Sequence, residues 1–270
     1  MTIAQQAARG AAWTIALSFL ARGFGVVGTI IITKFLNPDQ IGEVSAASII
    51  AFTASWLTTW GFGPYAVVKG RGEHALEVTW HATVAYVVLG VIGLGTVSLV
   101  ADGFAELVDA QKAAHFVPGM ALAVFIRRVA SMPERVLTRR MQFRPIGIAN
   151  AIGEVSYAVT AVSLAANGWG GSAMIIGNIV QAVVAATLLI RAAGWAEWAT
   201  PVKLRWARFR DMLRFGLPLG LESVAHNGAR YWDNLLVAHL YGGHATGLYN
   251  LAYNLADIPA TQIGEQLTQV

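Results

Sequence analysis

Long stretches without a charged side chain recur along the chain. No charged residue occurs from Val44 to Val68 or from Val78 to Ala101. A helix needs about 20 apolar residues to cross the hydrocarbon core of a bilayer. Both stretches therefore predict membrane-spanning helices, and they exclude a soluble protein, a secreted disulfide scaffold and a disordered chain.

Read in the same way, the whole sequence predicts an all-α, polytopic transmembrane bundle of about eight spans. The fourth span is the shortest, and we expect Arg127 and Arg128 to snorkel toward the interface at its end. The first apolar segment runs on to Phe35 without a cleavage site of small residues, which favours a retained span over a signal peptide. The predicted spans cover residues 11–35, 42–66, 78–101, 113–129, 146–166, 173–193, 214–240 and 246–268.

Composition agrees with this class and adds an orientation. Of the 270 residues 56% are hydrophobic and 13% are charged, against about 25% charged in a soluble domain. Most of the 19 basic residues fall in loops on the same side as the N-terminus. Because cytoplasmic loops are enriched in Lys and Arg, we expect a cytoplasmic N-terminus, and the net charge of +4 does not indicate a nucleic-acid partner. The absence of cysteine excludes disulfides, thiol catalysis and cysteine-ligated metals.

A weak internal repeat divides the chain. Phe35–Ala51 aligns with Leu240–Ala256, and in each case a short polar turn joins two spans. Repeats in the same orientation after an even number of spans are one of the known plans of transporters. We therefore expect a six-helix lobe over residues 1–205 and the first two helices of a second, incomplete lobe over residues 206–270. On this plan the chain is truncated relative to its relatives.

Ionisable residues inside predicted spans are costly and are candidates for function. In the seventh span four of them share one face at about 100° per residue, flanked by Asn227 and Asn234, and they are Glu222, His226, Arg230 and Asp233. Such a stripe lines a cavity or forms ion pairs within the bundle, and for His226 alone the pattern favours a hydrogen-bonded core residue. Arg22 in the first span precedes Gly25 and Gly28, which allow close helix approach. Glu154 in the fifth span can form an ion pair with an arginine or carry an exchangeable proton.

Several local patterns resemble the polysaccharide-biosynthesis flippases of the Wzx type, within the multidrug/oligosaccharidyl-lipid/polysaccharide exporter superfamily. One is the RFG-LP entry into the seventh span (Arg214–Pro218), and another is GLYNLAY after a mid-span aspartate (Gly247–Tyr253). The others are RRMQFRP (Arg139–Pro145) and ARGAAW (Ala8–Trp13). The resemblance implies a bacterial inner-membrane protein that translocates lipid-linked oligosaccharide by alternating access. It also implies contact with the machinery that polymerises or ligates polysaccharide.

On this resemblance the lumen binds the pyrophosphate of the substrate through Arg22 and Arg230, helped by Asn227 and Asn234, because guanidinium groups match phosphate oxygens. The candidates for ion coupling are His226, Asp233, Glu222 and Glu154. A multidrug-type small-molecule antiporter and a non-transporting fragment remain alternatives. We expect no enzyme, cofactor or metal site, because the sequence lacks a Walker A loop, HExxH and GxSxG. The basic stretch Arg127–Pro145 is predicted as an interfacial helix or a solvated loop.

Overall fold

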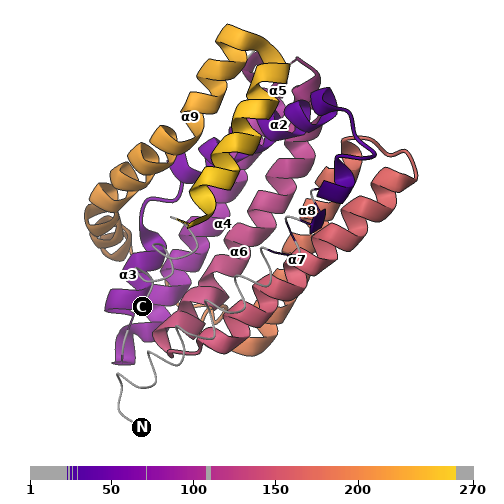
Figure 1. Cartoon of the computed structure of the whole chain (residues 1–270). Helices are drawn as coiled ribbons and strands as arrows, with labels where there is room; N and C mark the ends of the chain where they lie inside the picture. The colour runs from indigo at the N-terminus through magenta and orange to yellow at the C-terminus, as the bar shows by residue number, and fades with distance from the viewer. Residues whose placement is uncertain are drawn as a thin grey trace.

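The computed structural model describes residues 30–70, 72–107 and 111–259, together with residues 23, 25, 27 and 28. All regular elements in these residues are helical, which confirms the predicted all-α class. Figure 1 shows them as a bundle of long helices with one helix pair along its side. The elements are α2 (Pro38–Leu57), α3 (Phe62–Lys69), η1 (Gly72–His74), α4 (Ala75–Leu99), α5 (Ala101–Leu107), η2 (Gln111–Phe116), α6 (Val117–Arg139), α7 (Phe143–Ala166), α8 (Ser172–Ala193) and α9 (Trp206–Pro259).

The predicted second to sixth spans are present as helices. Within the described residues, four helical segments are long and apolar enough to cross a membrane: Ala75–Leu99, Lys112–Arg139, Phe143–Ala166 and Ser172–Ala193. Helices α2 and α3 together qualify as a fifth, with a bend of 47° at the break between them. The chain is thus a multi-pass membrane protein, and the second span differs from the prediction in being broken.

The fourth span extends well beyond its predicted end. Helix α6 continues to Arg139, so the solvated loop predicted as one alternative from Arg127 onward is wrong for this part of the chain, and its position at the membrane interface stays a prediction. The reason is that buried residues recur at helical spacing past the two arginines, and Ala130, Met132 and Val136 keep one face of the helix apolar. Arg127 and Arg128 consequently lie within the helix rather than at its end.

Helix α9 turns back on itself at Gly242, whose backbone has φ 79° and ψ 174°. Glycine adopts a positive φ without a steric penalty, and the turn falls where the sequence predicts a polar connection between the seventh and eighth spans (Figure 1). Elsewhere α9 is continuous, including at Pro218. It is not among the helices counted above, so the total of eight spans and the division into two lobes stay predictions.

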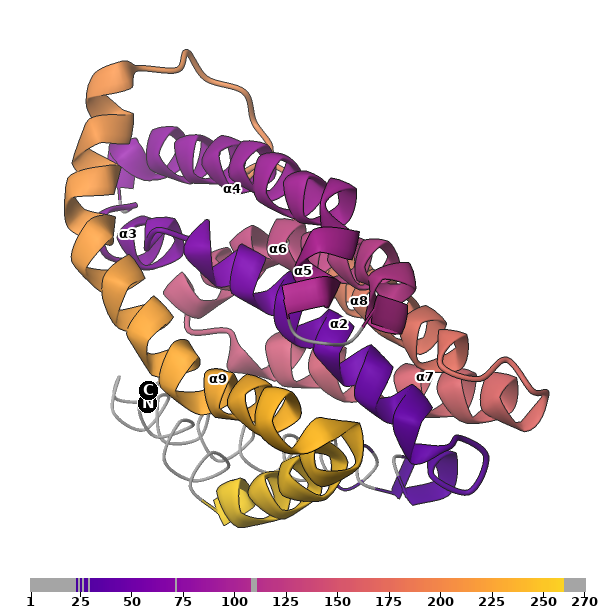
Figure 2. The ribbon, with the colours of Figure 1, turned by 90° about the horizontal axis from the view of Figure 1, so that it is seen from above.

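Helix α6 lies at the centre of the packing. It contacts α2, α3, α4, α7 and α8, while α7 and α8 form a hairpin and α9 packs on α2 and α3 from outside (Figure 2). Helices in lipid associate through close packing rather than through the hydrophobic effect, so small residues matter at their contacts. A Cβ atom at Gly119 of α6, for example, would lie 2.5 Å from Ile175 of α8. A core of apolar side chains, among them Phe62, Tyr86 and Met212, joins α3, α4 and α9.

The connections from α3 to α4, from α6 to α7 and from α8 to α9 lie at one end of the bundle, where ion pairs join residues in or beside them. Arg139 and Arg140, at the end of α6, both bind Glu197 in the connection from α8 to α9. Arg208 of α9 binds Glu77 of α4, with 3.1 Å between Nη2 and Oε2. These connections belong to the basic set of loops, so their shared location agrees with the predicted alternation of the spans.

The environment of Glu197 gives the ion pairs a pH dependence. Burial on its own raises the pKa of Glu197, but the hydrogen bonds and charges of Arg140 and Arg139 outweigh it, and the pKa of Glu197 lies below its ordinary value. A carboxyl group whose pKa falls on folding stabilises the folded state above its unfolded pKa of about 4.3. That contribution is lost as the pH falls through the lower folded pKa.

We therefore expect Glu197→Gln to lower the melting temperature of the detergent-solubilised protein at pH 7 by about 2–4 °C, the shift that about 1 kcal/mol produces in a chain of this size. The difference from the wild type should shrink below about pH 4, where the wild type loses the same ion pairs. Glu106→Gln, at an exposed carboxylate of α5, is the control and should melt like the wild type. Equal melting of the Glu197→Gln variant and the wild type at pH 7 would contradict the role assigned to Glu197.

Candidate functional site

The predicted substrate-binding residues fall outside what the structure describes. Arg22 is not among the described residues. Asn227, Arg230 and Asn234 lie in helix α9, but the description does not extend to their side chains. Their role in the lumen stays a prediction.

The remaining predicted residues of α9 differ in their surroundings. Glu222 and His226 are exposed, and Asp233 is half-buried. The hydroxyl of Tyr249 donates a hydrogen bond of 2.7 Å to Asp233, across the turn at Gly242. Asp233 therefore joins the two limbs of α9.

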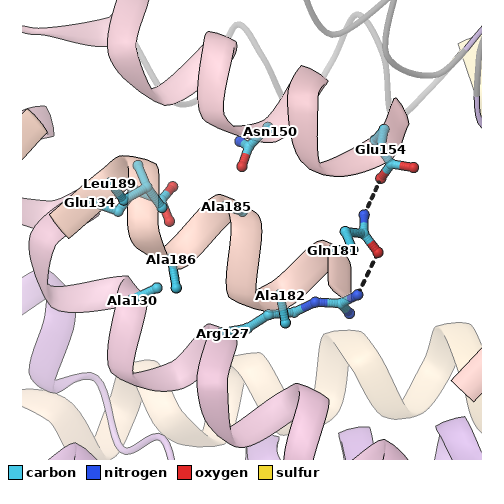
Figure 3. Close-up of a pocket in the computed structure, with 10 residues that line it drawn as sticks. All are labelled: Arg127, Ala130, Glu134, Asn150, Glu154, Gln181, Ala182, Ala185, Ala186 and Leu189. Carbon is cyan, nitrogen blue, oxygen red and sulfur yellow. Dashed lines mark hydrogen bonds between the residues drawn. The ribbon is translucent and has the colours of Figure 1, made fainter. Parts of the chain in front are cut away.

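Glu154 belongs to a chain of polar side chains that crosses three helices of the bundle. Nη2 of Arg127 on α6 donates to Oε1 of Gln181 on α8 at 2.7 Å. Nε2 of Gln181 in turn donates to Oε1 of Glu154 on α7 at 2.8 Å. A further bond of 2.8 Å runs from Arg127 to Asn178. The amide of Gln181 thus bridges a guanidinium and a carboxylate within the span helices (Figure 3).

The hydrogen-bonded side chains of Arg127, Gln181 and Glu154 border a cavity of about 210 Å³ between α6, α7 and α8. Glu134 of α6 and Asn150 of α7 also line it, and Figure 3 shows both apart from the hydrogen-bonded chain. Alanine side chains of α6 and α8 supply much of the remaining wall. A cavity of this size, with polar side chains along part of its wall, has room for several water molecules or a small hydrated ion.

The first span reaches the same place. A Cβ atom at Gly25 would lie 3.3 Å from Oε2 of Glu154, and one at Gly28 would lie 2.8 Å from Cβ of Ala158. The glycines of this span therefore allow the close approach to a neighbouring helix that the sequence predicts, and the neighbour is α7. Glu154 lies where α6, α7 and α8 meet and where Gly25 of the predicted first span approaches them.

Sequence reasoning found Glu154 but missed its partners. Arg127 was predicted to snorkel toward the interface at the end of the fourth span, because it opens a basic stretch, and the polar residues of α8 were not singled out. A signal was present, since Asn178 and Gln181 interrupt the apolar middle of the segment Ser172–Ala193 at a spacing of three residues, which places them on one helix face.

The hydrogen bonds of Gln181 to Arg127 and Glu154 should contribute to the stability of the folded protein. Gln181→Ala removes the bridge and leaves two charged groups with unsatisfied hydrogen-bonding capacity, which costs about 1–3 kcal/mol when the groups are shielded from water. We expect the melting temperature in detergent to fall by about 2–8 °C, on the scale of about 2–4 °C per kcal/mol.

The control for this change is Thr187→Ala on the same helix. Thr187 is exposed and bonds only the carbonyl of Val183 in its own helix, so its replacement should leave the melting temperature within about 1 °C of the wild type, as ordinary surface substitutions do. Equal melting of the two variants would show that the bridge contributes nothing.

Comparison with known proteins adds a family and a fold. The family model "Polysaccharide biosynthesis protein" matches residues 31–270. The lipopolysaccharide biosynthesis protein WzxC of Escherichia coli K12 is 23% identical over 274 residues, which cover 100% of this chain and 54% of WzxC. The succinoglycan biosynthesis transport protein ExoT of Rhizobium meliloti is 23% identical over 257 residues, 95% of this chain and 51% of ExoT. This chain therefore spans about half the length of these relatives.

Solved structures share the helical arrangement. An outward-facing multidrug resistance transporter of the MATE family, in the MOP superfamily, superposes with a TM-score of 0.69 at 17% identity. The match covers 98% of this chain and 64% of the transporter. At this identity the likeness establishes the fold.

Proposed function

This chain belongs to the polysaccharide biosynthesis protein family, and from that premise we propose that it acts in a flippase that translocates lipid-linked oligosaccharide by alternating access. We place it in a bacterial inner membrane with its N-terminus in the cytoplasm. Residues 1–205 form one lobe, and residues 206–270 begin a second. The observation that carries the proposal is the family match over residues 31–270 on a fold shared with a solved membrane transporter.

The substrate class follows from the relatives and from charge. One relative is named for lipopolysaccharide biosynthesis and the other for succinoglycan biosynthesis transport, and lipid-linked precursors of such polymers carry a pyrophosphate. Arg22 and Arg230 offer guanidinium groups that match phosphate oxygens bidentately, and Asn227 and Asn234 offer amide groups to the sugar. In the sequence Arg22 stands three positions before Gly25, the residue that approaches Glu154.

We assign the coupling ion to the cavity between α6, α7 and α8, with Glu154 as the group that takes it up and with His226, Asp233 and Glu222 as further candidates. With Glu154 ionised, its charge offsets that of Arg127 across the Gln181 bridge. When a proton or a cation neutralises Glu154, Arg127 is left as an uncompensated charge within the spans, which is costly. A bound anionic head group in the adjoining lumen would offset that charge. Ion and substrate then bind more tightly together than separately, as reciprocal linkage requires.

Export tests the substrate site. In a host whose own copy of the gene has been deleted, we expect Arg22→Ala and Arg230→Ala each to abolish polysaccharide export and to leave lipid-linked precursor in the cytoplasmic leaflet. Arg22→Lys and Arg230→Lys keep the charge but lose the bidentate geometry, and should restore export in part. Arg210→Ala, at an exposed arginine of α9, is the control. Full export with both Arg22 and Arg230 replaced would refute the anion site, and export of small cationic drugs instead would favour the multidrug alternative.

Glu154→Gln tests the coupling site separately. The variant keeps an oxygen that can accept from Gln181 but cannot bind a proton or offset a charge. We expect export to fall at least about tenfold, which corresponds to a loss of about 1.4 kcal/mol of interaction free energy, and the remaining export to lose its dependence on an imposed proton or sodium gradient. Glu106→Gln again serves as the control. A variant that still responds to the gradient like the wild type would exclude Glu154 as the coupling residue.

A further inference from the structure

The second span is interrupted at residues 58–61, the break between α2 and α3. Helix α2 ends at Leu57, helix α3 begins at Phe62, and the two are bent by 47°. Trp60 and Gly61 both have left-handed backbones, with φ values of 48° and 65°. A tryptophan rarely adopts this conformation, so the surrounding structure must hold it in place.

Arg128 holds the α2 side of the break. Its guanidinium donates to the carbonyl of Ser55 at 3.2 Å and to Oγ1 of Thr58 at 2.6 Å, and it also donates to the carbonyl of Thr58. The last carbonyls of a helix lack partners within the helix and carry partial negative charge. The carbonyl of Ser55 also accepts from the backbone N–H of Thr58. Arg128 adds a positive charge to this helix end and a donor to the carbonyl of Thr58, and only 6% of its surface is exposed.

The same guanidinium is linked to the α3 side of the break through Tyr86. The Arg128 guanidinium carbon lies 5.3 Å from the centre of the Tyr86 ring. The hydroxyl of Tyr86 accepts a hydrogen bond of 2.8 Å from the backbone N–H of Gly63, in the first turn of α3. Among the described residues no carboxylate lies within ion-pair distance of Arg128. Its charge therefore lies at the end of α2 and over the tyrosine ring, and Tyr86 links it to the start of α3.

The backbone of helix α9 is in close contact with the backbone of this break. A Cβ atom at Gly216 would lie 1.9 Å from the carbonyl oxygen of Trp60, and one at Gly220 would lie 3.2 Å from Cα of Trp60. From the other side, a Cβ atom at Gly61 would lie 2.7 Å from Cα of Gly216. Contacts this close are possible only where side chains are absent. Figure 2 shows α9 running past α3 and α2 along the outside of the bundle.

We propose that this contact, formed by Trp60 and Gly61 with Gly216 and Gly220, is the fulcrum on which α9 rocks during transport, and that Arg128 is the positioning residue that keeps it rigid. The proposal rests on the alternating-access function proposed above. A fulcrum requires that one short contact stay fixed while the rest of a helix moves. Two backbones that touch without intervening side chains can change their crossing angle without a clash. The hydrogen bonds of Arg128 hold the break at residues 58–61 in place while the angle changes.

Spin labels placed at two distances from the fulcrum test the proposal directly. The natural chain contains no cysteine, so labels can be attached at chosen exposed positions of the intact protein in membranes. Val159 on α7 serves as the common reference, paired either with Leu217 beside the fulcrum or with Leu248 beyond the turn at Gly242; all three side chains are exposed. We expect one narrow distance distribution for Val159–Leu217 and two populations for Val159–Leu248, whose ratio shifts when an ion gradient is imposed.

The outcomes separate this proposal from the function on which it rests. Two populations for both pairs would overturn the fulcrum and leave alternating access standing. One population for both pairs under every gradient, in protein that still supports export, would overturn both. Equal shifts at Leu217 and Leu248 would likewise rule out a fixed point near Gly216.

Variants of Arg128 test the positioning role. Arg128→Ala should broaden the Val159–Leu217 distribution and lower export at least tenfold, and Arg128→Lys, which keeps the charge and part of the donor capacity, should restore both in part. A narrow distribution in Arg128→Ala would refute the role of Arg128. Gly220→Ala disturbs the fulcrum without removing a charge and should also broaden the distribution, so the test stands even where Arg128→Ala folds poorly. Gly95→Ala is the matched control, because a Cβ atom there meets nothing within 4 Å.

Discussion

The described bundle depends on one constraint, which is that a polar group placed among apolar helices must find its partner inside the protein. Two adjacent arginines of α6 meet this constraint in different directions. Arg127 binds side chains of α8, and through Gln181 it is linked to α7, whereas Arg128 binds the end of α2. Adjacent residues of a helix point about 100° apart, so a single turn of the central helix can serve both sides of the bundle.

This constraint also explains which parts of the fold the sequence predicted. Uncharged stretches long enough to span a bilayer located the second to sixth spans, because the hydrocarbon core leaves the chain few alternatives to a helix. The break in the second span was not predicted, because residues 58–61 lie in a long uncharged stretch that was taken as one straight span, although Gly61 and Pro64 both disfavour a continuous helix at this point. What stabilises the break is Arg128, about seventy positions later in the chain, and Gly216 of α9.

The same limit applies to the candidate site. Glu154 could be predicted because a carboxylate within an apolar span is costly whatever its surroundings. Its partners could not be predicted, because Arg127 was counted among the basic residues expected on the cytoplasmic side. The number of basic residues in a segment does not distinguish an arginine at a helix end from one that is paired inside the bundle. The difference lies in the length of α6, which the buried residues Met132 and Val136 extend to Arg139. The polar stripe of α9 illustrates the converse, since the pairing of Asp233 with Tyr249 depends on a turn at Gly242 that brings two limbs together.

The placement of Arg127 and Arg128 on neighbouring positions gives the two proposals a common physical link. A change of charge at Glu154 acts on Arg127 through the amide of Gln181, and Arg127 is rigidly joined to Arg128 by the backbone of α6. Packed helices respond to a local change by shifting as units rather than by deforming gradually. A small displacement of α6 would therefore move the carbonyls of Ser55 and Thr58, which Arg128 binds, and with them the adjacent Trp60, which contacts Gly216 of α9. On this reasoning the proposed ion binding in the cavity and the proposed rocking of α9 are coupled through one helix.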